Sequence, residues 1–298
     1  MATRARAHEP VIHTAGRVPP AAPQFSVIYE SDTYVCVNKP FDVRVDGEHE
    51  HTVDKFVAAR LRDKLDEASA SSPLKPRLVH QLDYSTSGVM LMALTRQAAN
   101  YVARQFETRA TKKAYLALVY GSVCDTAHVV NRAIGATDGF EMRLVDETDS
   151  DAERSKAKAA TTHVYALSEG FYRGQPAAKL LLVPITGRRH QLRLHCQSLG
   201  HTIIGDATYG QDSHWPLGDP RNPERMYLHA YMLAVDLSLS ASAASMSLLA
   251  APDPFIGVLE DERTRLSEKD LLQIFRSHGL VDASRGAVED LQGIRAAA

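Results

Sequence analysis

Apolar and polar residues alternate in short runs along most of the chain, a pattern typical of half-buried β-strands. The runs predict two strands within 25–38 around a Ser-Asp turn, and further strands over 113–121, 159–169, 178–184 and 226–235. The last of these segments is also compatible with an apolar loop. The strand-like segments outnumber the helix-like ones, so a sheet is expected to dominate the structure.

Apolar residues at helical spacing occur in fewer places. They predict helices over 52–68, with Thr52 as the N-cap, and over 95–108. A short helix is predicted over 189–199, because Gly200 stands where a C-cap belongs. The segment 138–158 is polar and carries clustered charges, and it is predicted to be a mobile loop or a hairpin tip.

Composition divides the chain into three parts. Residues 1–23 are rich in Ala and Pro without apolar periodicity and are expected to form a disordered leader. Residues 24–257 are expected to form one domain, and 258–298 a C-terminal extension with a helix over 268–280 and an Ala-rich end. The leader has no hydrophobic signal region, so a cytoplasmic or nuclear protein is expected. Its three arginines leave a mitochondrial presequence as an alternative, although Pro10 and the Pro19-Pro20 pair disfavour the amphipathic helix that such a presequence forms.

Composition also excludes several classes of protein. No apolar run approaches the roughly 20 residues that a membrane-spanning helix needs, so no membrane association is expected. The three cysteines are scattered and lack a CxxC pair, which disfavours a disulfide framework and a cysteine-rich zinc site. The spacing of His49 and His51, and of His190 and His195, does not suit a metal site either.

Charge is unevenly distributed although the net charge is only −2. The segment 170–205 contains five basic residues and no acidic one, and the segment 96–120 contains five basic residues against a single glutamate. If these two segments meet in space, they form a positively charged groove that suits nucleic acid.

The candidate chemistry is concentrated in the stretch 77–95. Apolar residues on both sides enclose the polar cluster HQLDYSTSG, which places the carboxylate of Asp83 in a tight loop between two strand-like segments. On spacing alone, an Asp before Ser and Thr is more typical of a turn or a helix cap than of an active site.

The sequence HQLDYSTSG at 80–88 resembles the HRLDxxTSG signature of the RluA-type pseudouridine synthases, in which the Asp is catalytic. The only departure is Gln81, where most of that family has Arg. Two further motifs follow in the family order. KAYLA at 113–117 is similar to the segment in which a Tyr, here Tyr115, stacks on the target base. GRRHQLR at 187–193, followed by GHTIIGDATYG, is similar to the segment whose closing Arg, here Arg193, pairs with the catalytic Asp.

The resemblance covers roughly 25–256 and extends to Leu228, which in the family packs against the nucleotide. It implies a single α+β domain around a mixed, largely antiparallel sheet with flanking helices. It also implies isomerisation of uridine to pseudouridine in a structured RNA, with transfer RNA favoured over ribosomal or messenger RNA. Such a reaction needs no cofactor and no metal, and a monomer is expected to suffice.

Gln81 leaves a second function open. In much of the family the Arg at this position fills the gap left by a flipped-out base, whereas Gln brings no charge. The enzyme is therefore expected to act on a uridine that is already exposed, as in a loop. Alternatively, the chain is a catalytically weak relative that binds RNA as a chaperone. Retention of Asp83, Tyr115 and Arg193 favours the enzyme.

Overall fold

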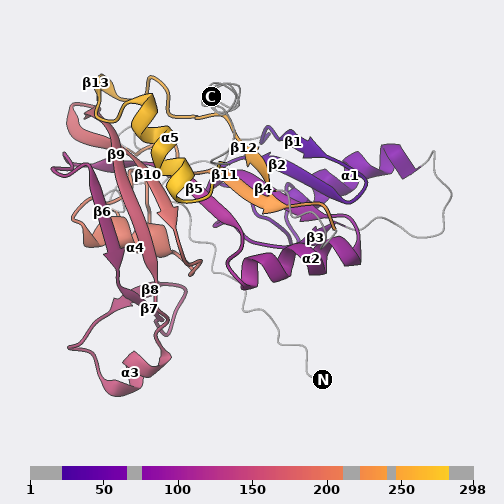
Figure 1. The fold of residues 1–298 in the computed structure, drawn as a ribbon, viewed down its shortest axis with the longest axis horizontal. Helices are drawn as coiled ribbons and strands as arrows, with labels where there is room; N and C mark the ends of the chain where they lie inside the picture. Colours follow the sequence, from indigo (N-terminus) through magenta and orange to yellow (C-terminus); the bar gives the residue numbers. More distant parts are fainter. Residues whose placement is uncertain (1–21, 66–75, 211–221, 240–245, 282–298) are drawn as a thin grey trace.

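The computed structural model describes residues 22–65, 76–210, 222–239 and 246–281 (Figure 1). Short strands dominate it, as the alternating pattern predicts. The disordered leader expected over 1–23 lies almost entirely outside the described residues, and so does the end of the chain after 281.

Most strands join one mixed, largely antiparallel sheet. Its main path runs through β1 (Ser26–Glu30), β2 (Tyr34–Lys39), β4 (Ser87–Ala93), β11 (Leu228–Asp236), β5 (Lys112–Tyr120), β10 (Gln175–Pro184), β9 (Thr161–Tyr172) and β13 (Glu260–Thr264). Three strands branch from this path: β3 (Arg77–Leu78) on β4, β12 (Met246–Ala250) on β11, and β6 (Ala127–Asn131) on β9. A separate hairpin consists of β7 (Ala133–Ala136) and β8 (Met142–Val145).

Two helices cover opposite faces of the half of the sheet around β2 and β4. Alternate residues of a strand point to opposite faces. Cys36 and Leu91 accordingly pack with Val102 of α2 (Arg96–Glu107). Val37 and Met90 pack on the other face with Val57 of α1 (Val53–Leu65). This half is therefore a three-layer structure.

The other half, around β5 and β10, repeats this arrangement with two different helices. Leu116 and Leu181 lie in a cluster with Phe275 of α5 (Glu268–Ser277). Ala117 and Leu180 lie in the opposite cluster with α4 (Gln191–Ser198). Figure 1 shows α5 on the near side of these strands and α4 at their lower end. A helix over 268–280 is thus confirmed for most of its length, and residues after 257 add an exposed edge strand to the sheet and a helix to its core.

The two halves meet where β4 and β11 run parallel, through the pairs Ser87–His229 and Gly88–Ala230. Gly88 has a φ of +110°, and a Cβ there would lie 2.2 Å from the carbonyl oxygen of Ala230. Only glycine permits this approach. The glycine of the HQLDYSTSG motif therefore fixes the loop that carries Asp83 against the neighbouring strand.

Helix ends agree with the sequence in most places. Thr95 caps α2 by accepting a hydrogen bond from the Ala98 amide at 3.1 Å. The helix expected over 189–199 begins later, at Gln191, because His190 takes a left-handed conformation with φ of 56°. The segment 226–235 is a strand rather than a loop.

Of the two predictions for 138–158, a mobile loop or a hairpin tip, the hairpin tip is confirmed between β7 and β8, but the helix that follows was not predicted. This segment includes β8 and then a helix, α3 (Asp151–Lys156), which a capping box of Ser150 and Glu153 begins. Residues of β7, β8 and α3 project together from one end of the molecule (Figure 1). The capping box offsets the absence of buried residues in this short helix. Among the described residues, no helix has the length and apolar character to span a bilayer.

Candidate active site

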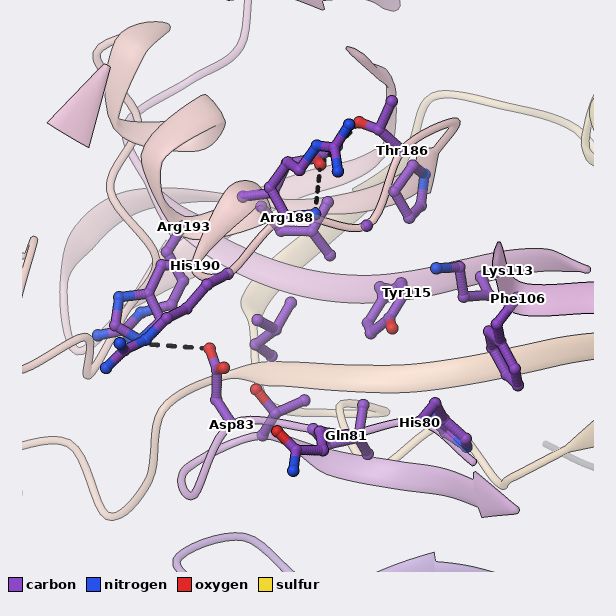
Figure 2. A pocket seen from close by; sticks show the side chains of 18 of the residues that line it. His80, Gln81, Asp83, Phe106, Lys113, Tyr115, Thr186, Arg188, His190 and Arg193 are labelled. Carbon is purple, nitrogen blue, oxygen red and sulfur yellow. Dashed lines mark hydrogen bonds and ion pairs between the residues drawn. The ribbon is translucent and has the colours of Figure 1, made fainter. Parts of the chain in front are cut away.

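A cleft of about 900 Å³ opens where the two halves of the sheet join, and all five residues singled out from the sequence line it: Gln81, Asp83, Tyr115, Arg193 and Leu228. Figure 2 shows the arrangement along the cleft. Asp83 lies near Arg193 and His190 at one end, Tyr115 occupies the middle, and Lys113, Phe106 and His80 lie at the other end.

A buried lysine holds the loop that carries Asp83 through hydrogen bonds to its backbone. The Lys39 ammonium donates to the carbonyl oxygens of Pro40, Tyr84 and Thr86 at 2.8–2.9 Å. The acceptors of Tyr84 and Thr86 belong to the loop that carries Asp83. Burial lowers the pKa of Lys39 to about 7, and the nearby carboxylates of Asp42 and Asp83 oppose that effect. The last residue of β2 therefore fixes the backbone on either side of Ser85 and keeps Asp83 at the cleft surface.

Arg193 lies between two carboxylates and binds one of them much more closely than the other. Its Nε and Nη2 donate to both oxygens of Asp206, at 2.7 and 2.6 Å. Its Nη1 lies 3.6 Å from Oδ2 of Asp83, which is an ion pair without a close hydrogen bond. Asp206 is 1% exposed and Asp83 is 30% exposed. Arg193 thus pairs with Asp83 as expected, but its closer partner is Asp206.

The pKa values of this pair follow from its charges. Burial alone would raise the pKa of Asp206, but the Arg193 guanidinium outweighs burial and holds it below the usual value. Burial alone would lower the pKa of Arg193, but Asp206 reverses the direction. Both groups therefore stay charged, and Arg193 presents a permanent positive charge to Asp83.

Aromatic contacts fix Arg193 and His190 from the side. The Arg193 guanidinium lies over the ring of Tyr209, 4.8 Å from its centroid. The Tyr209 hydroxyl accepts from the Met142 amide at 2.8 Å and lies 2.7 Å from Nδ1 of His190. Burial lowers the pKa of His190 to about 4, so this imidazole is neutral at physiological pH. Hairpin β7–β8 thereby contacts the active site through Tyr209.

Tyr115 and Leu228 form the walls of the middle of the cleft. Tyr115 lies on β5, and Leu228 is the first residue of β11, opposite Ala117 in the antiparallel register. Burial and the charge of Asp83 raise the pKa of the Tyr115 phenol, so its ring stays neutral. A planar base can pack against such an aromatic ring and the aliphatic side chain beside it.

The far end of the cleft is aromatic and basic. The ring of His80 stacks on Phe106 with centroids 4.8 Å apart, and its Nε2 accepts from the Leu91 amide at 2.9 Å. Burial lowers the pKa of His80 to about 3. The histidine of the HQLD motif therefore holds the loop against β4 as a neutral imidazole whose Nε2 is the acceptor.

The two basic segments of the sequence meet here, as predicted. Three acidic side chains line the cleft against six basic ones: Arg44, Arg109, Lys113, Arg188, Arg189 and Arg193. A chain with a net charge of −2 therefore presents a cleft with an excess of positive charge. Such a cleft attracts the phosphates of a nucleic acid.

Nothing in the described parts of the chain forms a group of three or more His, Cys, Asp or Glu able to hold a metal ion. His190 and His195, which the sequence brings close together, have separate protein partners. His190 contacts Tyr209, and His195 is buried against the Thr162 hydroxyl at 2.9 Å.

Comparison with known proteins identifies the family. Residues 33–198, more than half of the chain, match the family model described as RNA pseudouridylate synthase. The chain belongs to this family. It is 37% identical to RNA pseudouridylate synthase domain-containing protein 1 of Bos taurus over 269 residues, which covers 87% of this chain and 82% of the relative.

Two further comparisons agree. The chain is 33% identical over 220 residues to the dual-specificity RNA pseudouridine synthase RluA of Escherichia coli strain K12, covering 73% of this chain and 89% of the relative. The solved structure of human RNA pseudouridylate synthase domain containing 1 superposes with a TM-score of 0.68 at 33% identity, covering 87% of this chain and 98% of that one. Membership of this family makes the protein an isomerase that acts on RNA.

In a pseudouridine synthase, the uracil has to leave its ribose through N1 and return through C5. This reaction calls for a carboxylate beside the ribose and for side chains that retain the cleaved base. Asp83, Tyr115 and Leu228 are a carboxylate, an aromatic ring and an aliphatic side chain that line one cleft. Sequence reasoning assigned no role to Asp206, although it lies in the motif GDATYG. The position of Asp206 in a glycine-bounded motif shortly after Arg193 was the available signal, but it does not show which group the carboxylate binds.

Proposed function

We propose that this protein converts uridine to pseudouridine within a structured RNA, with Asp83 as the catalytic residue. The observation that carries the proposal is the ion pair of Asp83 and Arg193 at one end of a basic cleft whose middle is walled by Tyr115 and Leu228. The positive charge of Arg193 faces the Asp83 carboxylate at 3.6 Å and holds it at that end of the cleft.

Three other cleft residues, Tyr115, Leu228 and Gln81, contact the RNA in this reaction. Tyr115 stacks on the uracil, and Leu228 packs on the opposite face, so that the base stays in place while it rotates. Gln81 is exposed at the cleft surface directly before Leu82 and Asp83, where it can form hydrogen bonds with RNA but offers no charge.

Transfer RNA is the favoured substrate, ahead of ribosomal and messenger RNA. A uridine inside a duplex costs a few kcal/mol to unstack and extrude. Because Gln81 cannot fill the vacated stack with a cation, a uridine that is already unpaired is the better fit. Transfer RNA offers such uridines in loops that stable stems hold in place.

The alternative is an RNA-binding relative with weak catalysis, and Gln81 is the feature that favours it. Asp83→Asn separates the two functions. This substitution removes the charge but leaves the shape of the side chain, so RNA binding is expected to persist while turnover is lost. An RNA chaperone would keep its activity in this variant.

The deciding experiment is pseudouridine mapping of total RNA from cells with and without the protein, rescued with wild type or with Asp83→Asn. Sites that vanish and return only with the wild type identify both the activity and the substrate. Separate mapping of cytoplasmic, nuclear and mitochondrial RNA also tests the expected compartment. If no site changes in any fraction, the proposed activity is wrong.

A further inference from the structure

Two residues line the cleft beside Asp83 without a role in the chemistry above: Tyr84 and Arg44. Tyr84 follows Asp83 directly in the loop, and Arg44 comes from the segment after β2. The Arg44 guanidinium lies over the Tyr84 ring, 5.4 Å from its centroid. Both side chains are half-buried. They form an aromatic and cationic surface next to the catalytic carboxylate.

Backbone hydrogen bonds hold both residues in position. The Tyr84 carbonyl accepts from the buried Lys39 ammonium at 2.9 Å, and the Thr86 amide donates to the Asp83 carbonyl at 3.1 Å. The Arg44 carbonyl accepts from the Val53 amide at the start of α1 at 3.1 Å. A surface whose backbone is fixed before a ligand arrives loses little conformational entropy on binding.

The chemistry of this surface suits a nucleotide. Every nucleobase has a π-face that stacks on a tyrosine ring regardless of sequence, and a guanidinium nearby binds the adjoining phosphate. The uracil that reacts is held by Tyr115 and Leu228, on β5 and β11. The Tyr84 ring, directly adjacent to Asp83, can therefore contact a different base of the same strand.

We propose that Tyr84 and Arg44 form a second nucleotide site, which stacks the base adjacent to the target uridine and binds its phosphate. This inference rests on the proposed function and adds a substrate requirement to it: the neighbouring base must be unpaired. It also supplies a physical reason why the enzyme manages without a cation at Gln81. Stacking of the neighbouring base on Tyr84 keeps the strand open, in place of the Arg that fills the vacated stack in much of the family.

A double-mutant cycle with RNA tests this site in catalytically inactive protein, so that binding alone is measured. The probes are a short single-stranded oligoribonucleotide with one uridine flanked by adenosines, and two versions with an abasic ribonucleotide on the 5′ or the 3′ side of that uridine. Dissociation constants are measured by fluorescence anisotropy for Asp83→Asn alone and combined with Tyr84→Ala, Tyr84→Phe or Arg44→Ala. Tyr29→Ala is the matched control, because Tyr29 is 37% exposed on β1 and does not line the cleft.

We expect one of the two abasic RNAs to bind roughly 5- to 150-fold more weakly, the range for loss of one base stacked on an aromatic ring. Tyr84→Ala is expected to weaken binding of the intact RNA by a similar factor and to leave binding of that abasic RNA unchanged. Tyr84→Phe and Tyr29→Ala are expected to bind like the parent, and Arg44→Ala to reduce the salt dependence of binding.

Several outcomes overturn the site. One is that the effects of Tyr84→Ala and the abasic substitution multiply independently, which means that they do not share a contact. Another is that neither neighbour matters, or that the oligonucleotide does not bind at all. Turnover of a mapped cellular RNA by the wild-type protein tests the proposed function separately, so either proposal can fail while the other stands.

Discussion

Arg193 binds two carboxylates, and removing the charge of each is expected to affect stability and activity to different extents. The perturbations are Asp206→Asn and Asp83→Asn, which change the same functional group in the same way. Asp206 is buried and accepts two close hydrogen bonds from Arg193, whereas Asp83 is 30% exposed and makes one ion pair at 3.6 Å. The two contacts therefore differ in both burial and hydrogen-bond geometry.

The magnitudes follow from these geometries. Breaking a buried ion pair by removing one partner costs about 3–5 kcal/mol, because it leaves the other charge uncompensated. Asn retains one acceptor, so we expect Asp206→Asn to lower the free energy of unfolding by about 3 kcal/mol. An exposed pair contributes roughly 0–1 kcal/mol. Asp83→Asn is therefore expected to change stability by less than about 1 kcal/mol while abolishing turnover.

Urea unfolding at neutral pH measures both stabilities, and the acid dependence provides a second check. The pKa of Asp206 in the folded protein lies below its unfolded value, which is about 3.9. The unfolded state therefore binds the proton first as pH falls. The stabilisation by Asp206 is complete above about pH 5 and is lost as pH drops through the unfolded pKa toward the folded one. The difference between wild type and Asp206→Asn should shrink over that window.

Activity distinguishes a positioning role of Asp206 from a purely structural one. Without its charge, Arg193 is no longer held at the cleft, and we expect kcat to fall about tenfold or more, in line with a lost charge-assisted hydrogen bond of roughly 1.5–3 kcal/mol. KM should change little, because Asp206 itself does not line the cleft. Equal stability losses in the two variants, or wild-type kcat in a folded Asp206→Asn, would refute this reasoning.

Three further predictions concern single positions. Gly88→Ala should lower the free energy of unfolding in urea by about 3 kcal/mol or more, because its Cβ meets the Ala230 carbonyl, whereas Gly174→Ala, with open space around it, should cost about 1–2 kcal/mol. Tyr115→Phe should keep kcat/KM near the wild-type value, and Tyr115→Ala should lower it roughly 5- to 150-fold through lost stacking. Gln81→Arg should raise the rate on a uridine within a stem relative to one in a loop; equal wild-type rates on the two RNAs would contradict the role given to Gln81.

Much of the fold could be predicted from local patterns, because the signals involved are local. Apolar runs over 25–38 and 178–184 identify β1, β2 and β10, and alternate residues of β2 and of β10 pack against helices on opposite faces of the sheet. Thr95 caps α2 through a contact three residues away. The order of strands in the sheet is not local. The parallel contact of β4 with β11 joins residues about 140 positions apart, and the family resemblance implied only a mixed sheet, without saying which strands pair.

The site was predicted in its parts but not in its electrostatics. Asp83, Tyr115 and Arg193 were identified because each lies in a recognisable motif. The stronger bond of Arg193 to Asp206 could not be foreseen, since it depends on how the segment after α4 folds back. There, the Asp206 carboxylate accepts from the Thr208 and Tyr209 amides as well as from Arg193. Several donors around one carboxylate make a site for a guanidinium that no spacing reveals.

The division of labour between the two carboxylates explains how the cleft can be both stable and reactive. A carboxylate bound as tightly as Asp206 has both oxygens occupied and is poorly suited to chemistry. Asp83 lies farther from the Arg193 guanidinium, at 3.6 Å, and has no hydrogen bond to it. Its oxygens therefore remain accessible from the cleft. Asp206 and Tyr209 orient the Arg193 guanidinium, and Lys39 orients the loop that carries Asp83. Of these groups, the Asp83 carboxylate has the weakest contact with its partner. A substitution that tightened the Asp83–Arg193 contact should therefore stabilise the protein and slow the reaction.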